Sequence, residues 1–207
     1  ILLVSSWSLM TEERYLELRR AGVDQFSVSL DFPDNRHDEF RGYPGLYQQL
    51  DDVIPRCARH GFDDIVLNTC ITAANLEEIN GAADQAKKWG VNICYSAYSA
   101  RRTGNRELLP SSPEQLRILD YQLNGIEKRR NGSNFIVSAP TTIEATRRYF
   151  ETGGAPGCKA GLRFLVVTAD GYLQPCSMQF KRYPLDQQAR MVEEFTHHNT
   201  CDECYVA

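Results

Sequence analysis

The stretch AGVDQFSVSLD, residues 21–31, alternates between apolar and polar side chains from Gln25 onward. Successive side chains of a β-strand point to opposite faces of its sheet. The apolar face carries Phe26, Val28 and Leu30, and the polar face carries Ser27, Ser29 and Asp31. A parallel strand that is covered on both faces is apolar on both. We therefore predict a strand with one face in the core and the other toward a polar space.

Four further runs rich in β-branched and aromatic residues predict strands, at residues 2–5, 64–70, 91–98 and 135–138. Helix signals fall between them, including apolar residues at helical spacing in residues 46–57. Candidate N-cap residues are Thr11, Asn75, Ser112 and Thr141. Strand and helix alternate at intervals of about 30–35 residues, which predicts βαβ units and a parallel sheet.

Two more predicted strands also have a polar face. This face carries Val66, Asn68 and Cys70 in one strand, and Asn92, Cys94, Ser96 and Tyr98 in the next. In parallel α/β folds, ligands bind at the carboxyl ends of the strands. Three such strands in series predict a binding site at this edge of the sheet.

The alternation of strand and helix stops after Gly153-Gly154-Ala155-Pro156-Gly157. Two β-prone runs, residues 162–168 and 172–175, then flank Asp170-Gly171, a dipeptide typical of hairpin turns. A short amphipathic stretch follows at residues 185–195. We predict a domain boundary near residue 155, with a barrel-like domain at 1–155 and a small α+β domain at 156–207.

Four of the seven cysteines lie in this second part, at Cys158, Cys176, Cys201 and Cys204. The two-residue gap between the last two lets both thiolates bind one metal centre, and the hairpin brings the first two near each other. Four thiolates suit either zinc or an iron–sulfur cluster, and the ligand type does not decide between them. The other cysteines lie in predicted helix and strand positions, where cysteine usually serves as a small apolar filler.

The chain has 207 residues, of which 42% are hydrophobic and 24% charged, with a formal net charge of −4. This composition excludes collagen-like and disordered classes, and the acidic balance argues against a nucleic-acid-binding surface. The longest apolar runs, residues 1–4 and 164–167, are far shorter than the roughly 20 residues that cross a membrane. We expect a cytoplasmic protein with reduced thiols and with no nucleic-acid or membrane partner.

The chain resembles the radical S-adenosylmethionine (SAM, AdoMet) enzymes in two places. Residues 21–31, with the loop HDEFRG at residues 37–42, are similar to a strand of that family and the loop that follows it. Cys158, twelve residues, Gly171, four residues and Cys176 precede the CxxC at residues 201–204, and this spacing is similar to the SPASM/twitch pattern.

The resemblance implies a partial (β/α)6 TIM-like barrel followed by a twitch/SPASM-like domain, with the shorter twitch form favoured. It implies an oxidoreductase that cleaves SAM reductively to a 5′-deoxyadenosyl radical, which abstracts hydrogen from a substrate. The implied SAM-binding residues are Ser27, Ser29, Asp31 and Asn68. The implied ligands of an auxiliary [4Fe-4S] cluster are Cys158, Cys176, Cys201 and Cys204.

The family binds SAM through a second [4Fe-4S] cluster held by a CxxxCxxC motif, and these 207 residues contain no such spacing. We expect the motif upstream of Ile1 in a longer protein, so the chain by itself is expected to be inactive. The expected partners are a peptide or small-molecule substrate and an electron donor such as flavodoxin or ferredoxin.

Two alternatives stay open. The chain could instead be a non-catalytic α/β binding domain stapled by a structural zinc site with four cysteine ligands, which metal analysis distinguishes from an iron–sulfur domain. Arg101, Arg102 and Arg106 follow the predicted strand at 91–98. They either meet an anionic group of a substrate or of SAM, or are solvated loop residues.

Overall fold

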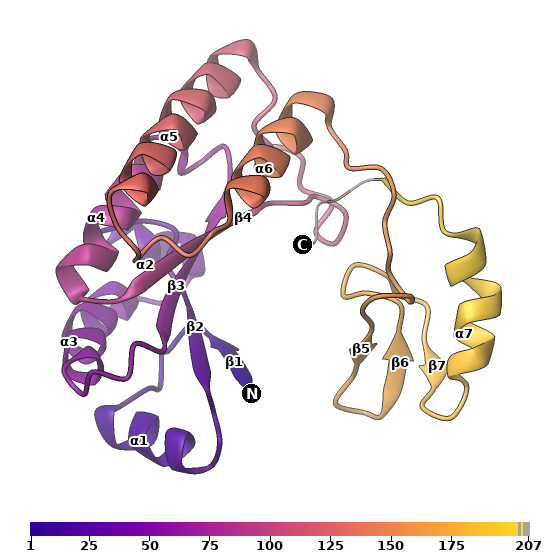
Figure 1. Cartoon of the computed structure of the whole chain (residues 1–207), viewed down its shortest axis with the longest axis horizontal. Coiled ribbons are helices and arrows are strands. Elements are labelled where there is room, and N and C mark those ends of the chain that lie inside the picture. Colours follow the sequence, from indigo (N-terminus) through magenta and orange to yellow (C-terminus); the bar gives the residue numbers. More distant parts are fainter. Residues whose placement is uncertain (203, 205–207) are drawn as a thin grey trace.

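The computed structural model describes residues 1–202 and residue 204. Within them, a parallel sheet of four strands in the order β1-β2-β3-β4 is followed by an antiparallel sheet of three strands in the order β5-β6-β7 (Figure 1). This arrangement confirms the predicted α/β class with a separate small sheet. No helix in residues 1–202 combines the length and the hydrophobicity needed to traverse a bilayer.

The strands are β1 (Leu2–Ser5), β2 (Gln25–Ser29), β3 (Ile65–Ile71), β4 (Asn92–Ala97), β5 (Val166–Val167), β6 (Tyr172–Gln174) and β7 (Tyr183–Pro184). The α-helices are α1 (Glu12–Arg20), α2 (Arg36–Arg41), α3 (Leu46–Ala58), α4 (Ile79–Trp89), α5 (Pro113–Asn131), α6 (Pro140–Thr152) and α7 (Gln188–Glu194). The 3₁₀ turns are η1 (Leu76–Glu78) and η2 (Thr196–His198).

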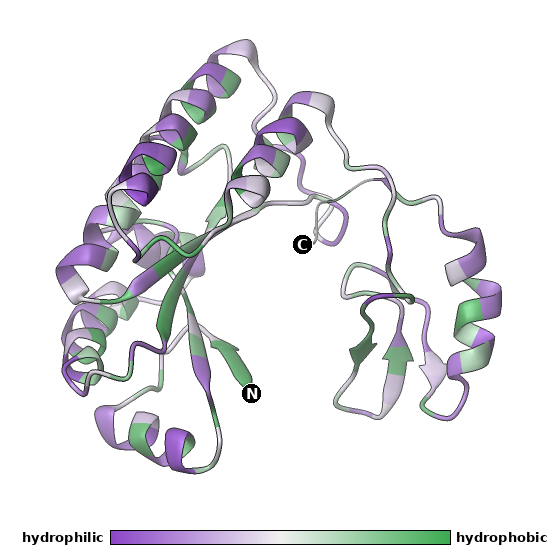
Figure 2. Ribbon diagram, in the orientation of Figure 1, coloured by the Kyte–Doolittle hydropathy of each residue, from purple (hydrophilic) through white to green (hydrophobic). Residues whose placement is uncertain are grey.

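Helices cover one face of the four-stranded sheet (Figure 1). The core residues of β2 are those of the predicted apolar face, and Phe26, Val28 and Leu30 are fully buried. They pack with apolar residues of α3 and α4, such as Leu50, in one continuous core. In β1 the face that points away from the core is apolar as well. Figure 2 shows β1 as a hydrophobic strand, and Leu2 on this outer face is 55% exposed.

Two of the predicted N-caps are confirmed. The Thr11 hydroxyl accepts a hydrogen bond from the backbone of Arg14 at the start of α1. Ser112 and Gln115 form the predicted capping box at the start of α5. The prediction for Thr141 was two residues late, because α6 begins at Pro140, whose fixed φ suits the first helical position.

The predicted strand at residues 135–138 is only a parallel bridge between Ile136 and Ile93. Ile93 donates to the carbonyl of Phe135 at 2.8 Å and accepts from the N–H of Val137 at 2.9 Å. The ladder stops there because the Ser138 hydroxyl, at 3.0 Å, takes the N–H of Tyr95 in place of a backbone carbonyl.

The predicted hairpin is confirmed, with Val166 opposite Gln174 and Val167 opposite Leu173. Its short strands pack a small core of Leu173, Tyr183 and Met191 against α7. Helix α6 ends at Gly153, which has a left-handed conformation. The division of the chain into two domains near residue 155 stays a prediction.

The prediction that Asn75 caps a helix is wrong. It makes no capping hydrogen bond, and a 3₁₀ turn precedes α4. Its side chain is buried instead at the ends of β2 and β3, where the amide nitrogen donates to the carbonyls of Asp31 at 3.1 Å and Cys70 at 2.9 Å. The amide oxygen accepts from the backbone of Thr72 at 2.8 Å. Asn75 therefore ties the two strand ends together.

Replacing Asn75 by Ala should lower the free energy of unfolding by about 2–3 kcal/mol, because it leaves buried backbone groups without partners. Urea denaturation followed by circular dichroism measures this loss. Asn124→Ala is the control, since the Asn124 side chain bonds only to exposed groups on the helix surface and its removal should cost about 0.5 kcal/mol or less. Equal losses in the two variants would contradict the role given to Asn75.

Candidate functional site

The predicted polar face is present at the carboxyl end of the four-stranded sheet. Ser27 is buried, and Ser29 and Asn68 are half-buried. Ser29 lies directly opposite Asn68 in the pairing of β2 with β3. The Asn68 amide oxygen accepts from the Ser96 hydroxyl of β4 at 3.0 Å. Three neighbouring strands thus place hydroxyl and amide groups side by side on one face.

Asp31 follows β2 and is fully buried. One carboxylate oxygen accepts from the Arg41 guanidinium at 2.6 Å, and the other accepts from the backbone N–H of Cys70 at 3.3 Å. Loss of hydration raises the pKa of Asp31, and the neighbouring Arg41 charge opposes this rise. The carboxylate therefore joins α2 to the ends of β2 and β3. Of the predicted SAM-binding residues, Asp31 is the one that is fully buried, and both of its carboxylate oxygens accept hydrogen bonds from protein groups.

His37 is a residue that the sequence analysis did not single out. It is fully buried, and its Nδ1 accepts the backbone N–H of Asp31 at 3.2 Å. This bond places the proton of the neutral ring on Nε2, a buried atom with no hydrogen-bond partner among the described residues. Burial, and then the Arg41 charge, lowers the pKa of His37 to about 4. The HDEFRG loop contains both His37 and Arg41, and its likeness to the family pattern was the available signal.

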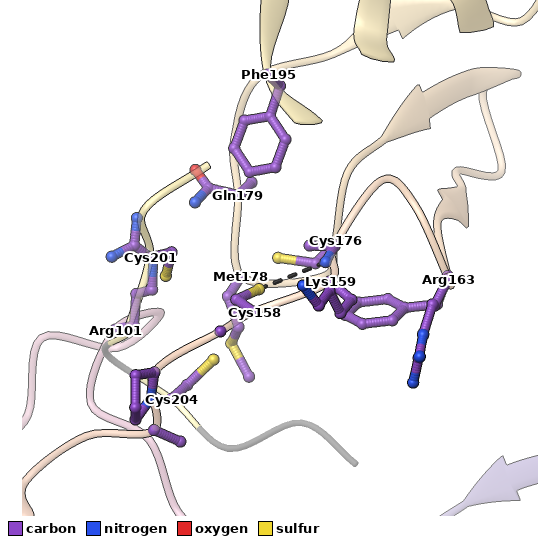
Figure 3. Close-up of a pocket in the computed structure, with 15 residues that line it drawn as sticks. Arg101, Cys158, Lys159, Arg163, Cys176, Met178, Gln179, Phe195, Cys201 and Cys204 are labelled. Carbon is purple, nitrogen blue, oxygen red and sulfur yellow. Dashed lines mark hydrogen bonds between the residues drawn. The ribbon is translucent and has the colours of Figure 1, made fainter. Parts of the chain in front are cut away.

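All four predicted metal ligands line one cavity of about 570 Å³. Cys158 comes from the glycine-rich segment after α6, Cys176 from the end of the hairpin, and Cys201 and Cys204 from the segment after η2. Figure 3 shows their side chains directed into the same cavity. The prediction that the hairpin gathers the first two cysteines therefore agrees with their placement.

Three of the described residues that line the same cavity as these thiols are cationic. Lys159 and Arg163 line the cavity, and Arg101 reaches it from the loop after β4 (Figure 3). Burial raises the pKa of Cys204 to about 11, with smaller contributions from the other three cysteines, and Arg101 opposes the rise. Mutual repulsion of the thiolates is expected in a site without a cation, and a bound metal centre relieves it.

Three local contacts hold the cysteine segments in place. The Asn199 amide nitrogen donates to the carbonyl of Cys158 at 3.2 Å, and its oxygen accepts from the N–H of Cys201 at 3.1 Å. The backbone of Ala155 donates to the carbonyl of Asp202 at 2.7 Å. A Cβ on Gly154 would lie 2.5 Å from that same carbonyl oxygen, so this approach requires glycine.

The donor set and the space fit an iron–sulfur cluster. The four cysteines supply a complete set of thiolate ligands around one cavity. The backbone N–H of Ala160 donates to the Cys158 sulfur at 3.4 Å, and such a hydrogen bond tunes the potential of a ligated cluster.

Comparison with known proteins found relatives in sequence and in structure. The chain is 27% identical to an AdoMet-dependent heme synthase of Methanosarcina barkeri over 85% of its length, and 24% identical to an AdoMet-dependent heme synthase of Oleidesulfovibrio alaskensis over 95%. A solved structure of native anSMEcpe with bound AdoMet matches 97% of the chain with a TM-score of 0.65 and 15% identity. The predicted resemblance to the radical SAM enzymes is therefore confirmed.

No protein-family profile matches the chain. The chain spans 54% and 60% of the two heme synthases and 58% of anSMEcpe, a little over half of each. The likeness in structure confirms the predicted fold class, a TIM-like α/β part followed by a smaller part with a hairpin. It leaves the roles of the individual serines and cysteines as predictions.

His37 gives the chain a measurable pH dependence. Its pKa in the folded state is about 4, below its ordinary value of 6.5, so the unfolded state binds more protons between these values. Stability should fall as the pH drops from 6.5 to 4, by about 3 kcal/mol from this group. The raised pKa of Asp31 acts in the opposite direction, so the comparison must isolate His37.

His37→Asn supplies this comparison, because an amide oxygen can accept the Asp31 N–H and does not titrate in this range. The variant's unfolding free energy should change less between pH 7 and pH 4 than that of the wild type. Urea unfolding at half-unit pH steps measures both curves. Parallel curves would show that His37 is not the buried neutral group described.

Proposed function

We propose that this chain supplies the AdoMet-binding strands and an auxiliary-cluster domain of a radical SAM enzyme that acts as an oxidoreductase. The observation that carries the proposal is the convergence of Cys158, Cys176, Cys201 and Cys204 on one cavity. The sequence likeness to AdoMet-dependent enzymes and the fold likeness to an AdoMet-bound structure support it. We propose that residues 1–155 form the AdoMet-binding part and residues 156–207 the cluster domain.

In this proposal the four thiolates hold an auxiliary [4Fe-4S] cluster. Such a cluster, when bound, provides a site that accepts or donates one electron. Arg101 offsets part of the negative charge of the thiolates, and the Ala160 N–H polarises the Cys158 sulfur. Asn199 fixes the spacing between the segments of Cys158 and Cys201 through its two hydrogen bonds.

The polar edge of the parallel sheet is the proposed AdoMet site. Ser27, Ser29 and Asn68 offer hydroxyl and amide groups on one face, and Ser29 lies beside Asn68. Asp31 contributes by holding this edge together through Arg41 and the Cys70 N–H. A second cluster in the full-length protein would supply the electron that cleaves AdoMet, with a small redox protein such as flavodoxin or ferredoxin as its source.

The substrate class we propose is a small molecule of the haem type. The sequence relatives named heme synthase are 24–27% identical to the chain. The structure of anSMEcpe that holds AdoMet and a peptide is 15% identical. The greater sequence likeness therefore favours the small molecule over the peptide.

Iron and sulfide analysis tests the cluster domain. After anaerobic reconstitution, the full-length protein should lose about four irons and four sulfides per chain when Cys176 is replaced by Ala. Cys94→Ala is the control, because Cys94 lies in β4 and does not line the cysteine cavity. One zinc per chain without acid-labile sulfide, lost in Cys176→Ala, would favour the structural zinc site instead.

AdoMet cleavage tests the enzyme class separately. The full-length, reconstituted protein should form 5′-deoxyadenosine from AdoMet when reduced with dithionite, as measured by liquid chromatography. Cys176→Ala should retain this cleavage, because the cysteine cavity lies away from Ser27, Ser29 and Asn68 in the parallel sheet. No 5′-deoxyadenosine in the wild type would contradict the proposed activity, whatever the iron content.

A further inference from the structure

A second cavity, of about 460 Å³, lies at the carboxyl ends of β3 and β4. Cys70 and Ser96 line it from the strands, Thr142 from the first turn of α6, and Ser177 and Met178 from the segment after the hairpin. None of the predicted SAM-binding residues lines it. The cavity adjoins the edge formed by Ser29 and Asn68, because Ser96 lines it and donates to the Asn68 amide oxygen at 3.0 Å.

The two cavities share a wall. Arg101 lines the cysteine cavity and its neighbour Arg102 lines the second one. In the same way Cys176 lines the first and Ser177 the second, while Met178 lines both. A molecule in the second cavity is thus separated from the cysteine cavity by Met178 and these two short segments.

The polar character of the second cavity is one-sided. Arg102 is its one charged side chain, and none of the described residues that line it is acidic. Most of its other polar groups are serine and threonine hydroxyls, which can donate hydrogen bonds. The hydroxyl of Tyr95 points elsewhere, since it donates to the carbonyl of Ile79 at 3.0 Å. A guanidinium among hydroxyl donors is suited to a carboxylate.

Arg102 is held at this position by its loop. The Tyr98 hydroxyl contacts that of Thr103 and donates to the carbonyl of Asn105 at 3.0 Å. The N–H of Gly104 donates to the carbonyl of Ala100 at 2.7 Å. These bonds close the loop on both sides of Arg102, and no described residue forms an ion pair with its guanidinium. The guanidinium is exposed at the rim of the cavity and is therefore available to a ligand.

We propose that the second cavity binds a carboxylate group of the substrate, with Arg102 as its counter-ion. The identification of the ligand as a substrate rests on the proposed function. The preference of the cavity for an anion does not depend on it. A carboxylate of AdoMet is the other source of the same chemistry. The lining of the cavity, which includes none of Ser27, Ser29 and Asn68 and shares Met178 with the cysteine cavity, favours the substrate.

Benzoate and benzamide form a matched pair of probes, because they share a ring and differ in charge. The ring suits the apolar part of the lining, formed by Ala97 and Met178. Titrations of the full-length protein followed by saturation-transfer NMR should give a dissociation constant at least tenfold lower for benzoate. Arg102→Gln should remove this preference, and Arg102→Lys should restore part of it, since charge-assisted hydrogen bonds are worth a factor of about ten or more.

Arg106→Gln is the matched control, because Arg106 lies in the same loop segment but does not line the cavity. It should leave the benzoate preference unchanged. Equal binding of the two probes by the wild type, or an equal loss in Arg106→Gln, would overturn the proposal.

AdoMet binding to the same proteins, measured by equilibrium dialysis, separates the two sources of the carboxylate. Arg102→Gln should bind AdoMet as the wild type does. A tenfold loss of AdoMet affinity in this variant would assign the carboxylate to AdoMet and overturn the substrate site. A wild type that prefers benzoate but binds neither iron nor AdoMet would support the anion cavity and overturn the proposed function alone.

Discussion

The four strands of the first sheet all run in the same direction, so the segments that follow them meet at one edge. Asp31 follows β2, Asn75 lies shortly after β3, and the loop with Arg101 and Arg102 follows β4. Asn75 joins the first two through bonds to the carbonyls of Asp31 and Cys70. The polar face, the buried carboxylate and the second cavity depend on this convergence, because each takes residues from strand ends that are distant in the sequence. The cysteine cavity takes Arg101 from it.

The shared wall between the cavities is built from two turns. The N–H of Gly104 closes one on the carbonyl of Ala100 at 2.7 Å, and the N–H of Gln179 closes the other on the carbonyl of Cys176 at 3.2 Å. Neighbouring residues of each turn line different spaces, as the pairs Arg101–Arg102 and Cys176–Ser177 do. The same geometry gives each cavity one arginine from a single loop. The two arginines thus have different surroundings, one among thiols and one among hydroxyls.

Local signals in the sequence predicted the local structure well. The caps at Thr11 and Ser112 and the hairpin around Asp170-Gly171 depend on residues within a few positions of one another. Asn75 was misread because a buried bridging amide and a helix cap have the same sequence signature. The partition of the two cavities could not be predicted, since it depends on how residues 101–102 lie against residues 176–178, and no short-range pattern records that placement.

The SVSLD motif shows why a pattern that identifies a family does not assign a role to each of its residues. Its serines lie on the polar face of β2, whereas Asp31, two positions beyond the strand, is fully buried. A carboxylate removed from water stays ionised only if it has a compensating charge and hydrogen bonds. Arg41 and the Cys70 N–H supply these. The backbone carbonyl of Asp31 in turn accepts a hydrogen bond from Asn75. The aspartate is therefore needed to build the edge on which the serines lie. Burial separates this structural role of Asp31 from the binding role proposed for the serines, and the motif does not record burial.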